Sequence, residues 1–269
     1  MKGVSLIGVD CATKGENIGL ALGWCDDEGV VHIKDACAGM EWDDVTKKLI
    51  GWIAAEKVVL LALDAPLGWP VALRSNIRCH KAGKPLRHVL DDADKLFYRQ
   101  TDLKMIKLYK RPLDVGANFI ARTAHAALAL LGELREKTGK KIRLAWTPGV
   151  PKNTQAIEVY PAATLIAHAG KDAAKIDKKF KSLSKKEKLL KKKEKILEKI
   201  KSAAFLDAKI KEQVFADESE QHVLDAVLCV LAAADFVRRD VIKPANCATR
   251  RRAKKEGWIW VKSPQSDAR

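Results

Sequence analysis

The fold is decided by the stretch VSLIGVD at residues 4–10, an apolar run that ends at the carboxylate Asp10. Two further short apolar runs follow at 17–24 and 30–37, and the links between them contain Gly, Asp and Lys. Short strands joined this tightly are typical of an antiparallel meander. We therefore expect three antiparallel strands, with Asp10 at the end of the first.

A helix and a fourth strand follow the meander. Residues 42–55 carry apolar side chains at helical spacing, namely Val45, Leu49, Ile50 and Ile53. Residues 58–63 are a continuous apolar run, typical of a buried central strand, and end at Asp64. A right-handed crossover places this strand parallel to the first. Because neighbouring strands lie about 4.8 Å apart, Asp10 and Asp64 are expected side by side.

The rest of the chain continues the α/β pattern. We expect helices at 116–137, 162–169 and 217–240, strands at 142–146 and 156–160, and an edge strand at 257–261. Glu158 ends one of these strands and joins the two aspartates if that strand adds in parallel. Asp225 lies two turns into the expected helix 217–240, where it can face the same edge.

These elements predict one α/β domain over residues 1–269. Its mixed central sheet combines the antiparallel three-strand meander with parallel strands and is flanked by helices. Two segments interrupt the pattern and are predicted to be insertions: 69–115, basic and irregular or helical, and 171–212, Lys-rich and helical. The length suits one large α/β domain or two small ones, and an apolar fraction of 47% excludes global disorder.

Positive charge is concentrated in the insertions. The chain has 50 Lys and Arg against 34 Asp and Glu, a net charge of +16. Residues 74–111 carry 11 basic and 4 acidic side chains, and residues 171–212 carry 16 and 7, so these two segments hold the whole excess. Such an excess favours a polyanionic partner, of which nucleic acid is the obvious one.

Four acids at one sheet edge repel one another and raise each other's pKa unless a cation lies between them. Hard Mg²⁺ or Mn²⁺ prefers carboxylate oxygens. Two such ions roughly 3.5–4 Å apart activate a water and stabilise the leaving oxygen of a phosphodiester. Taken singly, Asp10 also fits a turn residue and Glu158 a strand residue that faces solvent, whereas the buried context of Asp64 and the largely apolar helix around Asp225 favour a plain structural role less. The conjunction of Asp10, Asp64, Glu158 and Asp225 favours the metal site.

The sequence also resembles a known family. The similarity is carried by five segments in order, GVDCA at 8–12, LDAPLG at 63–68, IEVYPA at 157–162, HVLDA at 222–226 and EGWIW at 256–260. They resemble the family catalogued as domain of unknown function 429, a predicted RNase H-like nuclease group related in fold to RuvC-type resolvases. The resemblance covers nearly the whole chain except 171–212.

The resemblance implies roles for individual residues. It makes Asp10, Asp64, Glu158 and Asp225 metal ligands, and it puts His222, three residues before Asp225, in or beside the site. The stretch RQTD at 99–102 resembles the family's Arg-containing motif after the second carboxylate, which maps onto Arg99 and Asp102.

The function predicted from residues and resemblance is a metal-dependent nuclease that hydrolyses phosphodiester bonds of DNA or RNA with two Mg²⁺ or Mn²⁺ ions. Asp10, Asp64, Glu158, Asp225 and His222 are its predicted catalytic residues. The predicted substrate-binding residues are Arg74, Arg78, Arg99, Asp102 and Lys14.

Two other functions stay open. One is a non-catalytic nucleic-acid-binding module. The other is an ATP-using enzyme of the actin and sugar-kinase fold, because residues 8–14 resemble its first phosphate motif; that fold needs a second phosphate-binding domain, which we do not find. The Lys-rich helix is equally open, as a solvated amphipathic helix, a nucleic-acid contact or a membrane-surface helix.

Cysteine usage bears on the compartment. The six cysteines include no C-x-x-C pair, which argues against a zinc ribbon or a thioredoxin-like motif. They are also too sparse for a disulfide scaffold, so a reducing, cytoplasmic setting without membrane association is expected. The sequence does not predict an oligomeric state.

Overall fold

The computed structural model describes residues 4–84, 93–116, 118–173, 175, 183–216 and 221–264. Its centre is a seven-stranded sheet in the order β5-β6-β4-β1-β2-β3-β7. The strands are β1 Ser5–Asp10, β2 Gly19–Cys25, β3 Val31–Cys37, β4 Val59–Asp64, β5 Arg143–Leu144, β6 Gln155–Glu158 and β7 Ala204–Phe205. Strands β1 to β3 form the antiparallel meander, and β4, β6 and β5 add in parallel beside β1. The predicted mixed central sheet, an antiparallel three-strand meander with parallel strands added beside it, is confirmed.

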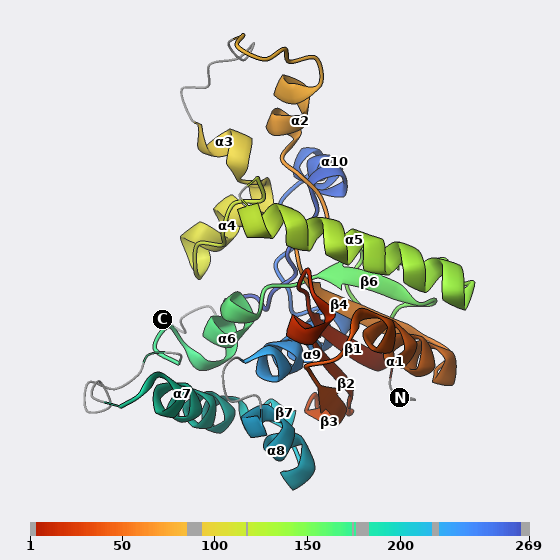
Figure 1. Ribbon diagram of the computed structural model, residues 1–269, viewed down its shortest axis with the longest axis vertical. Helices are drawn as coiled ribbons and strands as arrows, with labels where there is room; N and C mark the ends of the chain where they lie inside the picture. The colour runs from red at the N-terminus through yellow and green to blue at the C-terminus, as the bar shows by residue number, and fades with distance from the viewer. Residues whose placement is uncertain are drawn as a thin grey trace.

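Helices cover both faces of this sheet. They are α1 Trp42–Ala55, α2 Val71–Ile77, α3 Asp94–Phe97, α4 Gln100–Leu108, α5 Asn118–Thr138, α6 Pro161–Ala169, α7 Lys185–Ile200, α8 Ala208–Ala216, α9 His222–Val237 and α10 Cys247–Glu256. Side chains of β1 alternate between the faces. Ile7 and Val9 pack with α1 and α5, whereas Leu6 packs with α9. Figure 1 shows α1 and α5 on one side of the sheet and α9 on the other.

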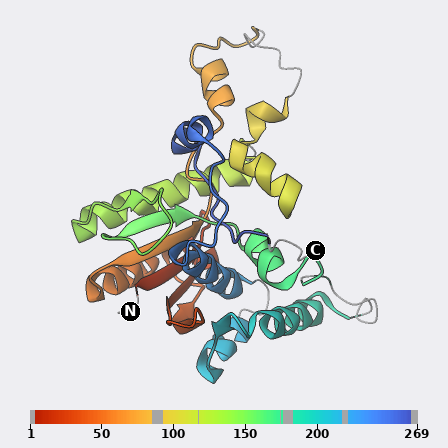
Figure 2. The same cartoon turned by 180° about the vertical axis from the view of Figure 1, so that it is seen from behind.

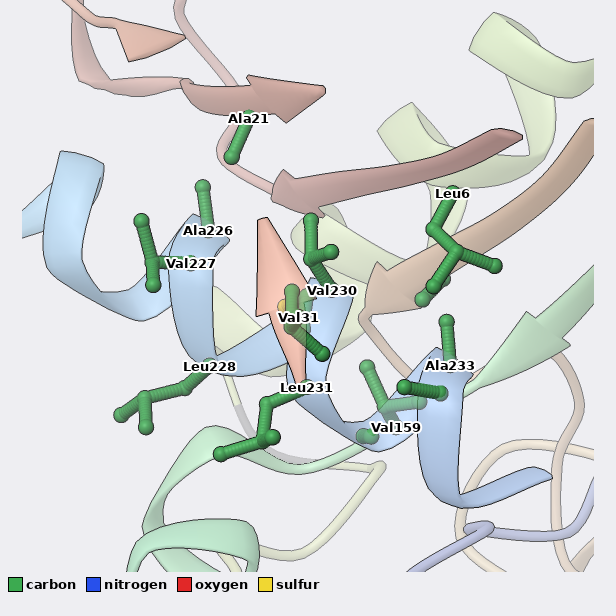
Figure 3. Close-up of a cluster of buried hydrophobic side chains, with 14 of the residues drawn as sticks. Leu6, Ala21, Val31, Val159, Ala226, Val227, Leu228, Val230, Leu231 and Ala233 are labelled. Atoms are coloured by element: carbon green, nitrogen blue, oxygen red, sulfur yellow. The ribbon is translucent and has the colours of Figure 1, made fainter. Parts of the chain in front are cut away.

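Close packing of α9 on the sheet depends on two strand glycines. A Cβ atom at Gly8 would lie 2.1 Å from the carbonyl oxygen of Ala226, and one at Gly19 would lie 2.0 Å from that of His222. Both contacts are with backbone, so no side chain fits at either position. Figure 3 shows Ala226 of α9 directed at Ala21 of β2. The glycines therefore bring the first turn of α9 against the ends of β1 and β2.

The two predicted insertions lie at opposite ends of the molecule. In the described part of 69–115, helices α2 and α4 pack beside α10, and α7 and α8 of the segment 171–212 lie at the far end (Figures 1 and 2). The Lys-rich segment also contributes β7, which pairs in parallel with the edge strand β3. Its predicted apolar stripe packs in the core through Ile196 and Ile200. Residues 85–92, 174 and 176–182 of these segments lie outside the described residues.

Two local predictions need correction. The expected edge strand at 257–261 is not a strand. Ile259 makes a single parallel bridge to Glu158, the last residue of β6, so the segment joins the sheet at one residue only, and Trp260 is buried against Phe236. Asp225 lies in the first turn of α9 and not two turns in, since the helix begins at His222. The expected start of that helix at 217–220 lies outside the described residues.

No helix within the described ranges is long and apolar enough to span a bilayer.

Candidate active site

Asp10 and Asp64 are paired at the carboxyl ends of adjacent parallel strands. The register of β1 and β4 places Asp10 directly opposite Asp64, as predicted. Burial, and then the charges of Asp10, Asp225 and Glu158, raise the pKa of Asp64 well above its usual value. Within the described residues, the Asp64 carboxylate has no hydrogen bond or ion pair to offset that repulsion.

Asp10 is held by a histidine from α9. The Nδ1 atom of His222 lies 2.7 Å from Oδ2 of Asp10, and the two side chains are 24% and 14% exposed. The histidine comes from the first residue of α9, which the glycine contacts bring against the sheet. The prediction that His222 lies beside the carboxylates therefore agrees with its position.

Asp225 faces the same edge and is linked to the Lys-rich helix. Gln221 donates from Nε2 to both carboxylate oxygens of Asp225, at 3.0 and 2.8 Å, and its Oε1 accepts from Nζ of Lys192 in α7 at 2.7 Å. Burial and the charge of Asp10 raise the pKa of Asp225 to about 7. The sequence analysis did not identify Gln221 or Lys192 as site residues. Gln221 could have been found from the sequence, because a Gln four residues before an Asp can hydrogen-bond to it along a helix. Nothing in the sequence identifies Lys192.

Glu158 forms a buried ion pair with Arg99. Its Oε1 lies 2.7 Å from Nη2 of Arg99, and its Oε2 accepts from Nη1 of Arg99 at 2.9 Å and from the backbone N–H of Leu67 at 3.0 Å. Burial raises the pKa of Glu158 and the charge of Arg99 lowers it, with a net rise. Glu158 thus meets Asp10 and Asp64 at the sheet edge, as predicted, but both of its oxygens are engaged by protein groups.

Arg99 and Asp102 are buried and are paired with each other, and Arg99 also pairs with Glu158. Arg99 is 1% exposed and Asp102 is 0% exposed. The five N–H groups of the guanidinium match five contacts, with Asp102 Oδ1 and Oδ2, Glu158 Oε1 and Oε2, and the carbonyl oxygen of Glu256. In this structure Arg99 and Asp102 neutralise and position Glu158. Both also line the cavity beside Asp64, and their predicted substrate-binding role stays a prediction.

Glu256 completes this buried network and was missed. It is 0% exposed and accepts from the backbone N–H groups of Val71 and Gln100, at 2.8 and 3.0 Å, and from Arg252. These contacts hold the starts of α2 and α4 beside the sheet edge. The sequence feature that could have identified Glu256 is its position as the first residue of the EGWIW segment.

A cavity of about 440 Å³ opens next to Asp64. Its wall combines carboxylates with the basic Lys110 and Arg111 and with the apolar Leu113 and the ring of Tyr160. Burial and the nearby Asp64 raise the pKa of Tyr160 to about 12, so its hydroxyl is neutral at pH 7. Lys110 and Arg111 are exposed basic groups that the sequence analysis did not single out.

The other predicted substrate-binding residues lie away from this cavity. Arg74 and Arg78 are exposed on α2 and just after it, and Lys14 is exposed and pairs with Glu16 at 3.3 Å. None of the three lines the cavity. Their predicted role stays a prediction.

The carboxylates fit a hard divalent cation by their chemistry. Asp10, Asp64 and Asp225 are oxygen donors of the kind that Mg²⁺ and Mn²⁺ prefer, and Asp64 lacks a cationic partner within the described residues. In the part of the chain that the structure describes, however, no three His, Cys, Asp or Glu side chains form a group that could hold a metal ion. The donor types therefore fit, and the side chains are not arranged as a formed three-ligand site.

Comparisons with known proteins found solved structures similar to this chain and a matching family model. RuvC of T. thermophilus in complex with a Holliday junction substrate is 12% identical, with a TM-score of 0.34 over 94% of this chain and 98% of that one. Thermus thermophilus RuvC alone is 13% identical, with a TM-score of 0.33 over 88% of this chain and 96% of that one. No curated protein matches the sequence significantly. The model of the family described as Protein of unknown function (DUF429) matches residues 8–246, and the chain therefore belongs to that family.

Proposed function

We propose that this protein is a metal-dependent nuclease that hydrolyses phosphodiester bonds of DNA or RNA. One observation carries the proposal: Asp10 and Asp64 lie opposite each other at the ends of adjacent strands, with Asp225 near enough to raise the pKa of Asp64. Buried like charges without a cation cost stability. Such an arrangement is typical of a site that binds cations.

The proposed ligands of Mg²⁺ or Mn²⁺ are Asp10, Asp64 and Asp225, whose side chains must turn toward one another to share an ion. When bound, a divalent cation polarises a phosphodiester and lowers the pKa of water. Glu158, although predicted as a ligand, is left out of the proposed set because Arg99 and Leu67 engage its oxygens. The proposed site binds two ions, and the number of Mn²⁺ ions bound per chain tests this.

His222 has two proposed tasks. Its contact with Oδ2 of Asp10 fixes the orientation of that carboxylate. Its ring is also 24% exposed, and an imidazole both donates and accepts protons, so it is placed to exchange a proton with solvent at the edge of the site.

Basic groups around the acids support a polyanionic substrate. Lys110 and Arg111 line the cavity next to Asp64, and Lys192 reaches the site through Gln221. Both insertions thus place cations close to the carboxylates, which alone would repel a phosphodiester. The junction DNA bound by the compared RuvC makes branched DNA one substrate to include in a test.

A cleavage panel tests the proposal. The full chain is incubated with Mg²⁺ or Mn²⁺ and with single-stranded, duplex and branched DNA and RNA, beside Asp10→Asn and an exposed control, Lys34→Gln on β3. We expect cleavage of at least one substrate by the parent and by Lys34→Gln, and none by Asp10→Asn. Equal cleavage by Asp10→Asn would reject the assignment. Salt-sensitive binding without cleavage under either metal would instead support the non-catalytic module.

A further inference from the structure

A second cavity lies at the opposite end of the parallel strands. Its volume is about 520 Å³, and its lining consists of Lys57, Lys140, Lys141, Arg143, Asn153, Thr154 and Gln155. These residues lie at or just before the amino ends of β4, β5 and β6, whereas Asp64 and Glu158 end β4 and β6. At about 3.3 Å per residue, the six residues of β4 separate the two sites by roughly 17 Å. The cavity is therefore distinct from the proposed active site.

The cationic side chains here have no acidic partners. Lys57, Lys141 and Arg143 are exposed, and none of them forms an ion pair with a residue that the structure describes. Lys140 is fixed in place, since its Nζ donates to the carbonyl oxygens of Ile53 and Glu56, at 2.7 and 3.0 Å, where α1 ends. Four cations thus surround one cavity that no carboxylate lines.

A buried hydroxyl in the wall also lacks a partner. Thr154 is 5% exposed, and its Oγ1 atom has no hydrogen-bond partner within the described residues. A buried hydroxyl without a partner is costly and uncommon, and a hydrogen-bond partner supplied at this wall would remove that cost. Asn153 lines the same cavity and offers an amide that donates in the same way.

We propose that this cavity binds a phosphoryl group. Three unpaired cations, a positioned lysine and two neutral donors suit a multiply charged oxyanion, whose oxygens accept charge-assisted hydrogen bonds. The source is either a free phosphate compound or the phosphodiester backbone of a nucleic acid, and the chemistry of recognition is the same. The site requires none of the carboxylates, so it stands whether or not the protein is a nuclease.

Inorganic pyrophosphate is the probe for the first test. Its binding to the full chain is measured by titration calorimetry at low salt for the parent, Lys141→Gln, Arg143→Gln and Thr154→Val, with Lys34→Gln as the matched control at another exposed lysine. Loss of one charge-assisted contact is expected to weaken binding roughly tenfold in Lys141→Gln and Arg143→Gln. Lys34→Gln should bind as the parent does.

Thr154→Val separates a ligand-binding role from a structural one. The change removes the unpartnered hydroxyl and nearly keeps its shape, so the unfolding temperature without ligand should be unchanged or higher, while pyrophosphate binding weakens. A lower unfolding temperature together with unchanged binding would contradict the proposal.

A second arm distinguishes the sources of the phosphoryl group. Binding of a fluorescent oligonucleotide without divalent metal is measured for the same variants. Weaker binding in Lys141→Gln and Arg143→Gln, with competition by pyrophosphate, identifies a nucleic-acid backbone; weaker pyrophosphate binding alone identifies a free phosphate compound. Binding of both probes that is equal in all variants, or absent in the parent, would overturn the proposal.

Discussion

Strands β4 and β6 are neighbours that both end in a carboxylate, but the two carboxylates have different surroundings. Glu158 is enclosed by Arg99 and a backbone N–H, and Arg99 is itself held by Asp102. Asp64 faces other carboxylates and, within the described residues, has no cation. One acid is thus neutralised by the protein, and the other keeps its capacity to attract a cation from outside.

This difference separates stability from activity. A buried ion pair is hard to break, because removal of one partner leaves an uncompensated charge. Removal of a charge from a repelling group has the opposite effect on stability. We therefore expect changes at Glu158 or Arg99 to affect mainly folding and changes at Asp64 to affect mainly activity.

The largest expected effect is that of Asp64→Asn on cleavage. If Asp64 binds the proposed cation, its loss should lower the cleavage rate about 10³-fold, which corresponds to the several kcal/mol that a bound cation supplies. Single-turnover kinetics with Mn²⁺ measure the rate, and urea unfolding should show that the variant is at least as stable as the parent. If Asp64→Asn were unstable and still active, Asp64 would serve folding and not activity.

Arg99→Gln should have the largest effect on stability. The change leaves both Glu158 and Asp102 buried without their cation, at an expected cost of about 3–5 kcal/mol in the free energy of unfolding. Urea denaturation of the parent, Arg99→Gln, Glu158→Gln and the double variant measures the coupling between the two residues. Additive losses in that cycle would show that the pair does not act as a unit.

The pH dependence of stability tests the unneutralised acids. The pKa of Asp225 is about 7 in the folded protein and about 3.9 when unfolded, so the folded state binds the extra proton between these values. Its contribution to stability is present below about pH 4 and is lost as the pH rises to about 7, by at most about 1.4 kcal/mol per pH unit. Relative to the parent, Asp225→Asn should gain stability across that range. A difference that is constant with pH would refute the assignment.

Metal ions should produce the smallest effect. Mn²⁺ at ten times its Kd is expected to stabilise the parent by about 1.4 kcal/mol, which shifts the unfolding temperature by roughly 3 °C for a chain of this size. The shift should be missing in Asp64→Asn and retained in Lys34→Gln. An equal shift in Asp64→Asn would place the cation elsewhere.

The sequence predicted the part of the site that depends on strand register. The positions of Asp10 and Asp64 follow from strand ends, a crossover rule and the spacing of neighbouring strands, all of which are local or nearly so. The structure confirms their pairing. The position of His222 followed from resemblance, and Gly8 and Gly19 provide its physical reason.

The partners of the acids could not be predicted in this way. Whether Glu158 faces solvent, a metal or Arg99 depends on the path of 69–115, which has no periodic pattern to fix it. Lys192 is one of sixteen lysines in 171–212, and only the orientation of α7 selects it. Tertiary contacts made by the two insertions therefore decided which charges became paired.

The Glu256 contacts also have a consequence for the order of folding. Glu256 accepts hydrogen bonds from the backbone N–H groups of Val71 and Gln100, which are 185 and 156 residues away in the sequence. During synthesis, β1 to β6 emerge well before α10, and contacts so distant in sequence form late. The nascent chain can thus assemble the sheet and align Asp10 with Asp64 while the starts of α2 and α4 still lack their acceptor. Synthesis must pass Glu256 before the wall around Glu158 closes.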